Sequence, residues 1–437
     1  MKHLVRWFVV IASLALVATS CTGDDGGDGG GATSPGASPE PVTITVVDYY
    51  GEATPLSEDV IAAFEAEYPW ITVKYEAGDW DSMREKFTVR VTSGDSPDVA
   101  TMDMTWIPTF ASKGIFADLT ELSGGQLNDA PITDQYSEGA VEAMTFEDHY
   151  VTMMFDFDAY ALYYRADQFD AKGIDVPTNW DELSAAAEQL AEDTDGDGEN
   201  DKYMFEVYGN DCFHWCQFLF QAGGTILTDD NTAAAFDSEA GLSAMEYYRS
   251  FLDNGSGVYW GEAEGEPIRG IKDERIGMFL DGPYYMGLLK DGAPDQSGKW
   301  KVAPAPYSVE PGSYLGGTGL SIPVNAPHPE EAWLFVQYML RPEQQLGVFT
   351  LAGAAPATEA ALASPELTQP DEYFGGQAPF PIFADTMAIA THFPYVEQWD
   401  PIDTAIGTMV ESVMLGESAP QEALTDGAAK VNEELAG

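Results

Sequence analysis

The acidic loop at residues 193–201, DTDGDGEND, has the residue types and spacing of a calcium-binding loop. Its oxygen ligands would come from Asp193, Asp195, Asp197, the Glu199 carbonyl and Asp201, at positions 1, 3, 5, 7 and 9 of the loop. Gly198 takes the turn position between them. Met204 stands where an EF-hand places its last glutamate. The spacing therefore predicts a structural Ca²⁺ site that is not a full EF-hand, with a metal-free acidic turn as the alternative.

Two cysteines lie four residues apart in DCFHWC, at Cys212 and Cys216. Outside the cell, a disulfide is the usual state of such a pair. His214 between them would add an imidazole, but two thiols and one imidazole are fewer ligands than a structural zinc site uses. We therefore predict a disulfide, with a metal site as the alternative.

Motifs of catalysis are missing from the sequence, which has no G-x-S-x-G elbow, no H-E-x-x-H and no P-loop. We therefore expect no enzyme activity. A secreted glycoside-active enzyme stays open as an alternative, because the chain has 73 acidic residues and the separation of two carboxylates depends on the fold.

The chain is strongly acidic, with 19 basic and 73 acidic residues and a formal net charge of −54. Such a charge repels phosphates and excludes a nucleic-acid partner. The acids are spread along the chain, which favours a solvated surface suited to a saline or alkaline exterior. Selection for a cationic ligand is the alternative.

The N-terminus has the features of a secretory signal over residues 1–20. Lys2 and Arg6 precede an apolar run that is too short to span a bilayer well, and small residues lead into Cys21. VATSC resembles a bacterial lipobox, with Ala18 where leucine is commonest, so Cys21 is the predicted lipidation site. Residues 21–41 are rich in Gly, Asp, Ser and Pro, and predict a disordered tether. The expected location is the outer face of the cytoplasmic membrane, held by the lipid anchor only, with simple secretion as the alternative.

The rest of the chain alternates strands and helices. The opening order is expected to be strand 42–47, helix, strand 71–76, helix 83–92 and strand 97–102. This βαβαβ start implies an open sheet of mostly parallel strands. A second α/β unit begins with strand 161–164 and a helix carrying Trp180, for which Thr178 and Asp181 form a capping box. Nearly 400 residues after the signal and tether are enough for two domains.

An ordered set of segments resembles the extracellular solute-binding proteins of bacterial ABC importers, in the branch that includes maltose-binding protein. The matching segments are AFEAEYPWITVKYE, SGDSPDVATM, ALYYRADQFDAKGIDVPTNWDEL, FLFQAGGTIL, IGMFLDGPYYM, GGTGLSIPVNAPHPEEAWLFVQYMLRPEQQ and LAGAAPATEAAL. They cover nearly all of the chain after the tether. One departure is Arg165, where the family usually has asparagine.

The resemblance implies an α/β fold with two lobes, the type II periplasmic-binding-protein fold. Each lobe would be an open, mostly parallel sheet flanked by helices, and crossing strands would hinge the lobes. Lobe 1 would contain residues 42–153 and 316–357, and lobe 2 residues 154–315 and 358–437. We expect a monomer.

The resemblance also implies where a ligand binds. A sugar requires carboxylates or amides beside aromatic rings. The expected ligand-binding residues are Trp80, Asp81, Asp103 and Trp106 at the strand ends of lobe 1, Asp158 beside the first crossing, and Phe213, His214, Trp215, Tyr284 and Trp399 in lobe 2. Tyr284 takes the place of the tryptophan in the family's NGPW turn.

The function that follows from the resemblance is capture of a carbohydrate, expected to be an oligosaccharide, outside the cell. The protein would deliver it to the transmembrane subunits of an ABC permease. The same fold binding a polyamine or another cationic solute is the alternative, because the chain is so acidic.

Overall fold

The computed structural model describes residues 39–50, 56–210, 212–259 and 267–436. The signal, Cys21 and nearly all of the tether lie outside the described residues, so the predictions made for them stay predictions.

The first sheet is built on the predicted βαβαβ start. Strand β1 (Val42–Asp48) pairs in parallel with β2 (Ile71–Ala77) and with β3 (Val99–Asp103). Helix α1 (Glu58–Glu67) connects β1 to β2, and α2 (Trp80–Ser93) connects β2 to β3. Each helix begins at a side-chain cap, because the oxygens of Ser57 and Asp79 accept hydrogen bonds from backbone N–H groups of the first turn.

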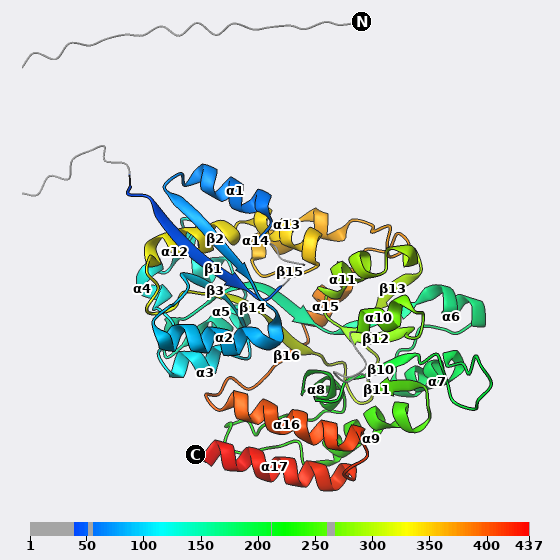
Figure 1. The fold of residues 1–437 in the computed structure, drawn as a ribbon. Coiled ribbons are helices and arrows are strands. Elements are labelled where there is room, and N and C mark those ends of the chain that lie inside the picture. The colour runs from blue at the N-terminus through cyan, green and yellow to red at the C-terminus, as the bar shows by residue number, and fades with distance from the viewer. Residues whose placement is uncertain (1–38, 51–55, 211, 260–266, 437) are drawn as a thin grey trace, which may run out of the picture. The chain divides into compact units, whose positions relative to one another are not determined.

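Two long strands that come from later in the chain complete this sheet. Strand β14 (Tyr314–Ser321) runs antiparallel to β3 and to β8 (Met153–Ala159). The short strands β15 (Ala355–Pro356) and β16 (Thr391–His392) pair with β8 and β14. The order is β15-β8-β14-β3-β1-β2 (Figure 1). The sheet is therefore mixed rather than mostly parallel, since β8 and β14 join it as crossing strands and not through βαβ connections.

The second sheet has the order β11-β10-β12-β9-β13. Its strands are β9 (Ala161–Arg165), β10 (Phe205–Val207), β11 (Gly257–Tyr259), β12 (Met278–Asp281) and β13 (Trp300–Ala303). Strand β10 is parallel to β11 and β12, whereas β9 is antiparallel to β12 and β13. Only Tyr160 separates β8 from β9, so the chain passes there from the first sheet to the second.

The helices that accompany the first sheet are α1, α2, α3 (Ile107–Ser112), α4 (Leu119–Ser123), α5 (Glu138–Met144), α12 (Pro329–Met339), α13 (Pro342–Ala352) and α14 (Glu359–Leu362). Those of the second half are α6 (Ala166–Lys172), α7 (Trp180–Leu190), α8 (Cys212–Gln221), α9 (Glu239–Asp253), α10 (Pro267–Lys272), α11 (Tyr285–Gly292), α15 (Phe380–Met387), α16 (Trp399–Met414) and α17 (Pro420–Ala436). Short hairpins pair β4 (Gln126–Leu127) with β5 (Ala130–Pro131) and β6 (Thr145–Phe146) with β7 (His149–Tyr150). In the described part of the chain, no helix is both long enough and apolar enough to cross a membrane.

Each sheet has its own hydrophobic core. The core of the first sheet gathers side chains of β1, β3 and β8 with those of α1 and α12. The core of the second gathers β9, β10 and β12 with α7, α8, α9 and α16. Helices α16 and α17 lie side by side and pack on α9 (Figure 1). The α/β fold with two lobes is thus confirmed. Residues 41–437 form one compact unit, so the predicted lobe boundaries stay a prediction.

The cap of α7 differs from the prediction by one residue. Asn179, not Thr178, is the N-cap and accepts a hydrogen bond from the Glu182 N–H. The Glu182 carboxylate in turn accepts from the N–H and hydroxyl of Thr178, at 2.8 Å each. The reciprocal pattern of a capping box is present, but its acid is Glu182 rather than Asp181.

Candidate functional site

Carboxylates and hydroxyls meet where the crossing strands join the first sheet. Asp156 and Asp158 alternate with Phe155 and Phe157 on β8, so both carboxylates leave the same face of the strand. The Tyr50 hydroxyl donates a hydrogen bond to the Asp156 carboxylate. The Thr318 N–H on β14 donates to Asp156 Oδ1 at 3.0 Å. These donors hold Asp156 in one orientation.

Asp103 occupies the carboxyl end of β3, as predicted. Its Oδ1 accepts hydrogen bonds from the N–H and hydroxyl of Thr105, at 2.8 and 2.6 Å. Its Oδ2 accepts from Trp80 Nε1 at 3.0 Å. The Trp80 ring lies 5.3 Å from the Trp106 ring, which packs in turn against Tyr49 at 5.6 Å. Three of the predicted residues therefore form one contact group at this strand end.

The second sheet contributes the turn after β12. Asp281 ends the strand and accepts a hydrogen bond from the Gly282 N–H at 2.7 Å. A Cβ on Gly282 would lie 3.0 Å from Asp158 Oδ1, so the carboxylate of the crossing strand lies against this turn. Tyr284 lies two residues after Gly282, and its hydroxyl interacts with Asp281. Asp158, Asp281 and Tyr284 are thus neighbours.

Glu206 adds a buried carboxylate from the middle of β10. It is 3% exposed, while Phe205 and Val207 on either side point into the core of the second sheet. A side-chain hydrogen bond with Tyr208 acts on its carboxyl. Its electrostatic neighbours are Asp281 and Tyr208. The Tyr208 ring stacks on His214 with the ring centres 3.8 Å apart.

We call this group of acids the interlobe acidic cluster; its members are Asp103, Asp156, Asp158, Glu206 and Asp281. Burial raises the pKa of Asp103, and hydrogen bonds from Thr105 oppose the rise. Burial raises the pKa of Asp156 to about 7. The pKa of Asp158 is raised well above its usual range by burial and by the charges of Asp156 and Asp281. Burial and the charge of Asp281 raise the pKa of Glu206 in the same way. These acids therefore act on one another as one group.

Contacts between the two halves of the molecule surround the cluster. The Trp80 ring of α2 lies 6.1 Å from the Phe213 ring of α8. Arg84 of α2 forms a 3.1 Å ion pair with Asp400 of α16. These contacts join elements that are distant in the sequence, and through Trp80 they bring an aromatic contact between the two halves next to Asp103.

Buried carboxylates beside aromatic rings are suited to binding a small polar solute. Carboxylate oxygens accept hydrogen bonds from hydroxyl or ammonium donors, and ring faces cover apolar or cationic groups. The described part of the chain contributes no Lys or Arg ion pair to Asp103, Asp156, Asp158 or Glu206.

The family model for bacterial extracellular solute-binding proteins matches residues 50–346. The chain belongs to this family. A putative binding protein of Brucella abortus is 26% identical over 90% of this chain and 92% of its own length. The diacetylchitobiose binding protein DasA of Streptomyces coelicolor is 23% identical and covers 100% of this chain and 99% of its own length. Among solved structures, an ABC transporter solute-binding protein of Thermotoga lettingae bound with α-D-tagatose has a TM-score of 0.79 at 28% identity, over 91% of this chain and 100% of that one.

In this solute-binding protein, most of the predicted ligand-binding residues lie at or next to the acidic cluster. They are Trp80, Asp103, Trp106, Asp158, Phe213, His214 and Tyr284. Asp81 lies in the first turn of α2, but its side chain is outside the described residues. The ligand roles of all these residues stay predictions.

Trp215 and Trp399 lie in the core instead. Trp215 is completely buried and packs against Phe236. It follows His214 on α8, and one helical residue turns the side chain by about 100°, which carries it from the interlobe face into the core. Trp399 is 1% exposed and lies behind Phe393 at 4.8 Å. A stacking role for either tryptophan has no support in this geometry.

Several members of the site were not predicted: Tyr49, Tyr50, Asp156, Glu206, Tyr208, Asp281 and Thr318. Tyr49 and Tyr50 directly follow β1, so the strand-end rule that selected Asp103 would also have selected them. The alternation FDFD on β8 could have indicated Asp156 as the partner of Asp158. Glu206 carries no such signal beyond being a charged residue inside a short apolar strand.

The predicted calcium loop brings three of its carboxylates together. Oxygens of Asp193, Asp195 and Asp197 lie within 4.8 Å of one another on the surface. Each also accepts a hydrogen bond from a backbone N–H of the loop, for example from Gly196 to Asp193 at 2.6 Å. Asp201 is not in this group, and its carboxylate accepts hydrogen bonds from the N–H groups of Thr194 and Asp195 at 2.8 and 3.2 Å. The residue types and convergence fit a hard cation, with a smaller ligand set than expected.

The two cysteines begin α8 and touch each other. Their sulfur atoms lie 3.0 Å apart, longer than the bonded distance of about 2.05 Å, so the structure does not contain the predicted disulfide. Cys212 and Cys216 are one helical turn apart on the same face, which brings the thiols into contact but points the two Cβ–Sγ bonds in similar directions.

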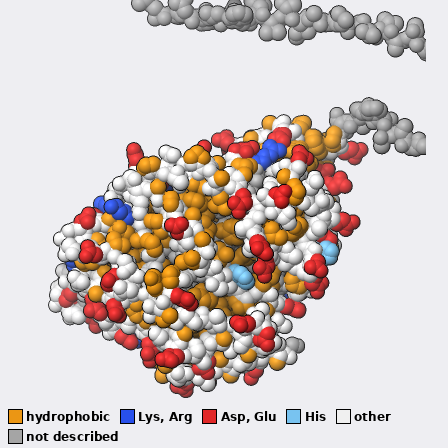
Figure 2. All heavy atoms as spheres, turned by 180° about the vertical axis from the view of Figure 1, so that it is seen from behind, with side chains coloured by type: hydrophobic (Ala, Val, Ile, Leu, Met, Phe, Trp, Pro, Cys, Tyr) orange, Lys and Arg blue, Asp and Glu red, His pale blue; other side chains and the backbone are white. Residues whose placement is uncertain are grey.

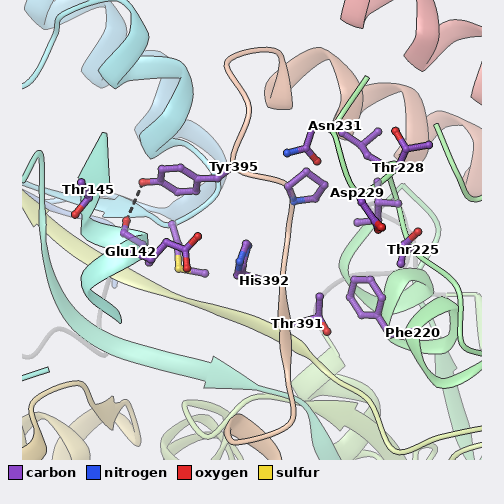
Figure 3. A pocket seen from close by; sticks show the side chains of 15 residues that line it. Glu142, Thr145, Phe220, Thr225, Thr228, Asp229, Asn231, Thr391, His392 and Tyr395 are labelled. Carbon is purple, nitrogen blue, oxygen red and sulfur yellow. Dashed lines mark hydrogen bonds between the residues drawn. The ribbon is translucent and has the colours of Figure 1, made fainter. Parts of the chain in front are cut away.

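A separate hollow of about 600 Å³ lies beside the segment that contains β16. Figure 3 shows Glu142 and Thr145 on one side of His392, and Phe220, Thr225 and Asp229 on the other. The Tyr395 hydroxyl closes one edge by donating to the Ala143 carbonyl at 2.8 Å. Of the predicted ligand-binding side chains that the structure describes, none lines this hollow, so its size does not make it the better candidate site.

Proposed function

We propose that this solute-binding protein captures a carbohydrate outside the cell, between its two lobes, and delivers it to the membrane subunits of an ABC transporter. The observation that carries the proposal is the placement of buried carboxylates from both sheets beside the aromatic residues Trp80 and Tyr284. Relatives that align over nearly the whole chain support it, because DasA is named for diacetylchitobiose and the Thermotoga lettingae protein holds tagatose.

Different side chains would bind different parts of the sugar. Asp103 and Asp158 would accept hydrogen bonds from sugar hydroxyls, and the rings of Trp80 and Tyr284 would cover the apolar faces of the sugar. Tyr50 and Thr318 fix the orientation of Asp156 at the base of the site. Each hydroxyl bound in this way would satisfy an acceptor that is otherwise removed from water.

Closure of the lobes would couple binding to delivery. The Arg84–Asp400 ion pair and the hydrogen bond from the Thr109 hydroxyl to the Glu397 carbonyl, at 3.0 Å, join the two halves of the molecule. Such contacts exist only when the lobes are together, so a ligand that contacts both sheets favours this form. The membrane subunits would then recognise the closed surface.

A thermal-shift screen of the mature chain against neutral mono- and oligosaccharides tests the proposal, followed by titration calorimetry of each sugar that raises the melting temperature. We expect stoichiometric binding without breakdown of the sugar, and weaker binding in Asp158→Asn. Glu422→Gln, an exposed acid on α17, is the matched control and should bind like the wild type. Release of shorter sugars during the titration, or equal affinity in Asp158→Asn and the control, would contradict it.

We also propose that Cys21 carries the lipid that holds the protein on the outer face of the cytoplasmic membrane. The support is the lipobox-like VATSC and the tether of residues 21–41. In cell fractionation, Cys21→Ser should move the protein from the membrane fraction to the medium. Retention of the variant on the membrane would refute acylation as the anchor.

A structural Ca²⁺ at Asp193, Asp195 and Asp197 is a further proposal, supported by the convergence of their oxygens. The ion would stabilise the loop between α7 and β10. We propose no role for it in binding the sugar.

A further inference from the structure

The hollow beside β16 is a second place where the two halves of the molecule meet. One wall carries Glu142 and Thr145, from α5 and β6 of the first half, and the other carries Thr225 and Asp229, which follow α8 in the second half. Figure 3 shows these walls on opposite sides of His392. With a volume of about 600 Å³, the hollow has the size of a site for a small molecule.

The end of β3 separates this hollow from the interlobe acidic cluster. Asp103 ends β3 and belongs to the cluster, whereas Met104, the next residue, lines the hollow. The Met104 N–H donates to the Gly317 carbonyl of β14 at 2.9 Å, so the contact with β14 continues through it. Side chains of consecutive extended residues point to opposite faces. The hollow therefore lies on the other side of this strand end and is distinct from the cluster.

The buried side chains that line the hollow are apolar, and the exposed ones are polar. Those at most 7% exposed are Met104, Phe220, Ile226 and Leu227. The exposed ones are Glu142, Thr225, Asp229, Asn231, Thr391 and His392. Hydroxyl and amide groups both donate and accept hydrogen bonds, and carboxylates accept them. Such a lining matches a molecule with an apolar face and hydroxyl groups around its edge.

Two rings of the hollow are fixed by backbone carbonyls. The Tyr395 hydroxyl donates to the Ala143 carbonyl at 2.8 Å. His392 Nδ1 donates to the Phe393 carbonyl, also at 2.8 Å. Because these hydrogen bonds already restrict both side chains, binding a ligand beside them would cost little further side-chain entropy. The hollow thus presents preorganised rings next to hydroxyl groups.

We propose that the hollow is a second carbohydrate-binding site, which takes a small neutral sugar between Glu142 and Asp229. The apolar face of the sugar would lie against Phe220, and its hydroxyls would donate to the two carboxylates. The carboxylates disfavour an anion, and the polar side chains disfavour a fully apolar molecule. This site is additional to the capture site at the interlobe acidic cluster, and only its coupling to capture rests on the proposed function.

Occupation of the hollow would favour the same form of the protein as capture does. A sugar in the hollow would contact Glu142 of one half and Asp229 of the other, so it would bind best at the spacing seen here. In this form the Arg84–Asp400 ion pair also joins the halves. A ligand stabilises the form to which it binds more tightly, and coupling between two sites is reciprocal. Sugar at either site should therefore strengthen binding at the other.

Counting the sugars bound per chain tests the inference. Equilibrium dialysis would use radiolabelled glucose, maltose and cellobiose, each up to millimolar concentration. We expect at least one of them to bind the wild type as two molecules per chain. The double variant Glu142→Ala/Asp229→Ala changes two exposed side chains and should bind only one, while Glu422→Gln should still bind two. In Asp158→Asn the hollow should keep its sugar, with a dissociation constant about fivefold higher because the capture site is weakened.

The outcomes separate this inference from the proposed function. One sugar per wild-type chain with the same affinity in the double variant, or two sugars that both remain in it, would overturn the second site and leave capture standing. An unchanged hollow affinity in Asp158→Asn would overturn the coupling. One sugar per chain that the double variant loses and Asp158→Asn keeps would overturn the proposed capture site and the two-site inference. Binding of spermidine but of no sugar, or no binding at all, would overturn both proposals.

Discussion

Ionisation of Asp156 should make the ligand-free protein less stable as the pH rises. Burial raises the pKa of this carboxyl from 3.8 to about 7, against the opposing effect of hydrogen bonds from Tyr50 and Thr318. Between these two pH values the folded chain keeps a proton on Asp156 that the unfolded chain has lost. Asparagine at this position keeps an oxygen for the Thr318 N–H, at 3.0 Å in the wild type, and cannot ionise.

The size of the effect follows from the two pKa values. A rise from 3.8 to about 7 corresponds to about 4 kcal/mol, at 1.36 kcal/mol per pKa unit. This stabilisation is fully present below pH about 4 and is lost as the pH rises through about 7, with about 2 kcal/mol lost between pH 5.5 and 8. Exposed acids are ionised throughout that window, because their pKa values are about 4. Asp158 and Glu206, whose pKa values are also raised, act in the same direction.

Urea denaturation followed by tryptophan fluorescence, at pH 5.5 and pH 8, measures this directly. The wild type should lose about 2 kcal/mol or more of unfolding free energy over the window, and Asp156→Asn should lose about 2 kcal/mol less than the wild type. Glu422→Gln should behave like the wild type. If Asp156→Asn kept the full pH dependence of the wild type, the reasoning about this buried carboxyl would be refuted.

Three further outcomes are expected. Tyr284→Ala should weaken sugar affinity by ~1–3 kcal/mol through lost ring contact, measured by calorimetry, and unchanged affinity would remove Tyr284 from the site. Trp399→Ala should lower the unfolding free energy by about 3–5 kcal/mol in urea, because Trp399 is a core side chain; a variant of unchanged stability would contradict that placement. EGTA should lower the melting temperature of a calcium-loaded sample, with Asp195→Asn insensitive to it, and an unmoved melting temperature in the wild type would exclude the ion.

The sequence predicts those parts of the site that follow general rules of strands and helices. Asp103 was predicted because polar residues at the carboxyl ends of parallel strands face ligands, and it lies there. The cap of α7 was predicted within one residue, since Thr178, Asn179 and Glu182 all take part in it. Local spacing determines such features, so no knowledge of the folded chain is needed.

Other parts depend on which elements meet in space. Glu206 lies inside a three-residue strand, and only the pairing of β10 with β12 places it near Asp281. Trp215 and Trp399 have the residue type of a sugar platform, but the packing of α8 and α16 on the second sheet buries them. The first sheet is mixed because β14 inserts between β3 and β8 and runs antiparallel to both. Local sequence patterns do not show where such a distant strand will pair.

Acidic side chains are scattered over the face of the molecule that Figure 2 shows, as the sequence indicated. The acids of the proposed capture site are instead the buried ones between the two sheets. The net charge of the chain therefore comes mainly from its surface, whereas the candidate site is formed by the few acids of the interlobe acidic cluster.

A crystal structure of the protein with the tightest-binding sugar from the screen is the most direct test of carbohydrate capture between the lobes. The account predicts sugar density in contact with Asp158, Tyr284 and Trp80, with residues of both sheets around it. Sugar density confined to the hollow lined by Glu142, Asp229 and His392 would contradict the account.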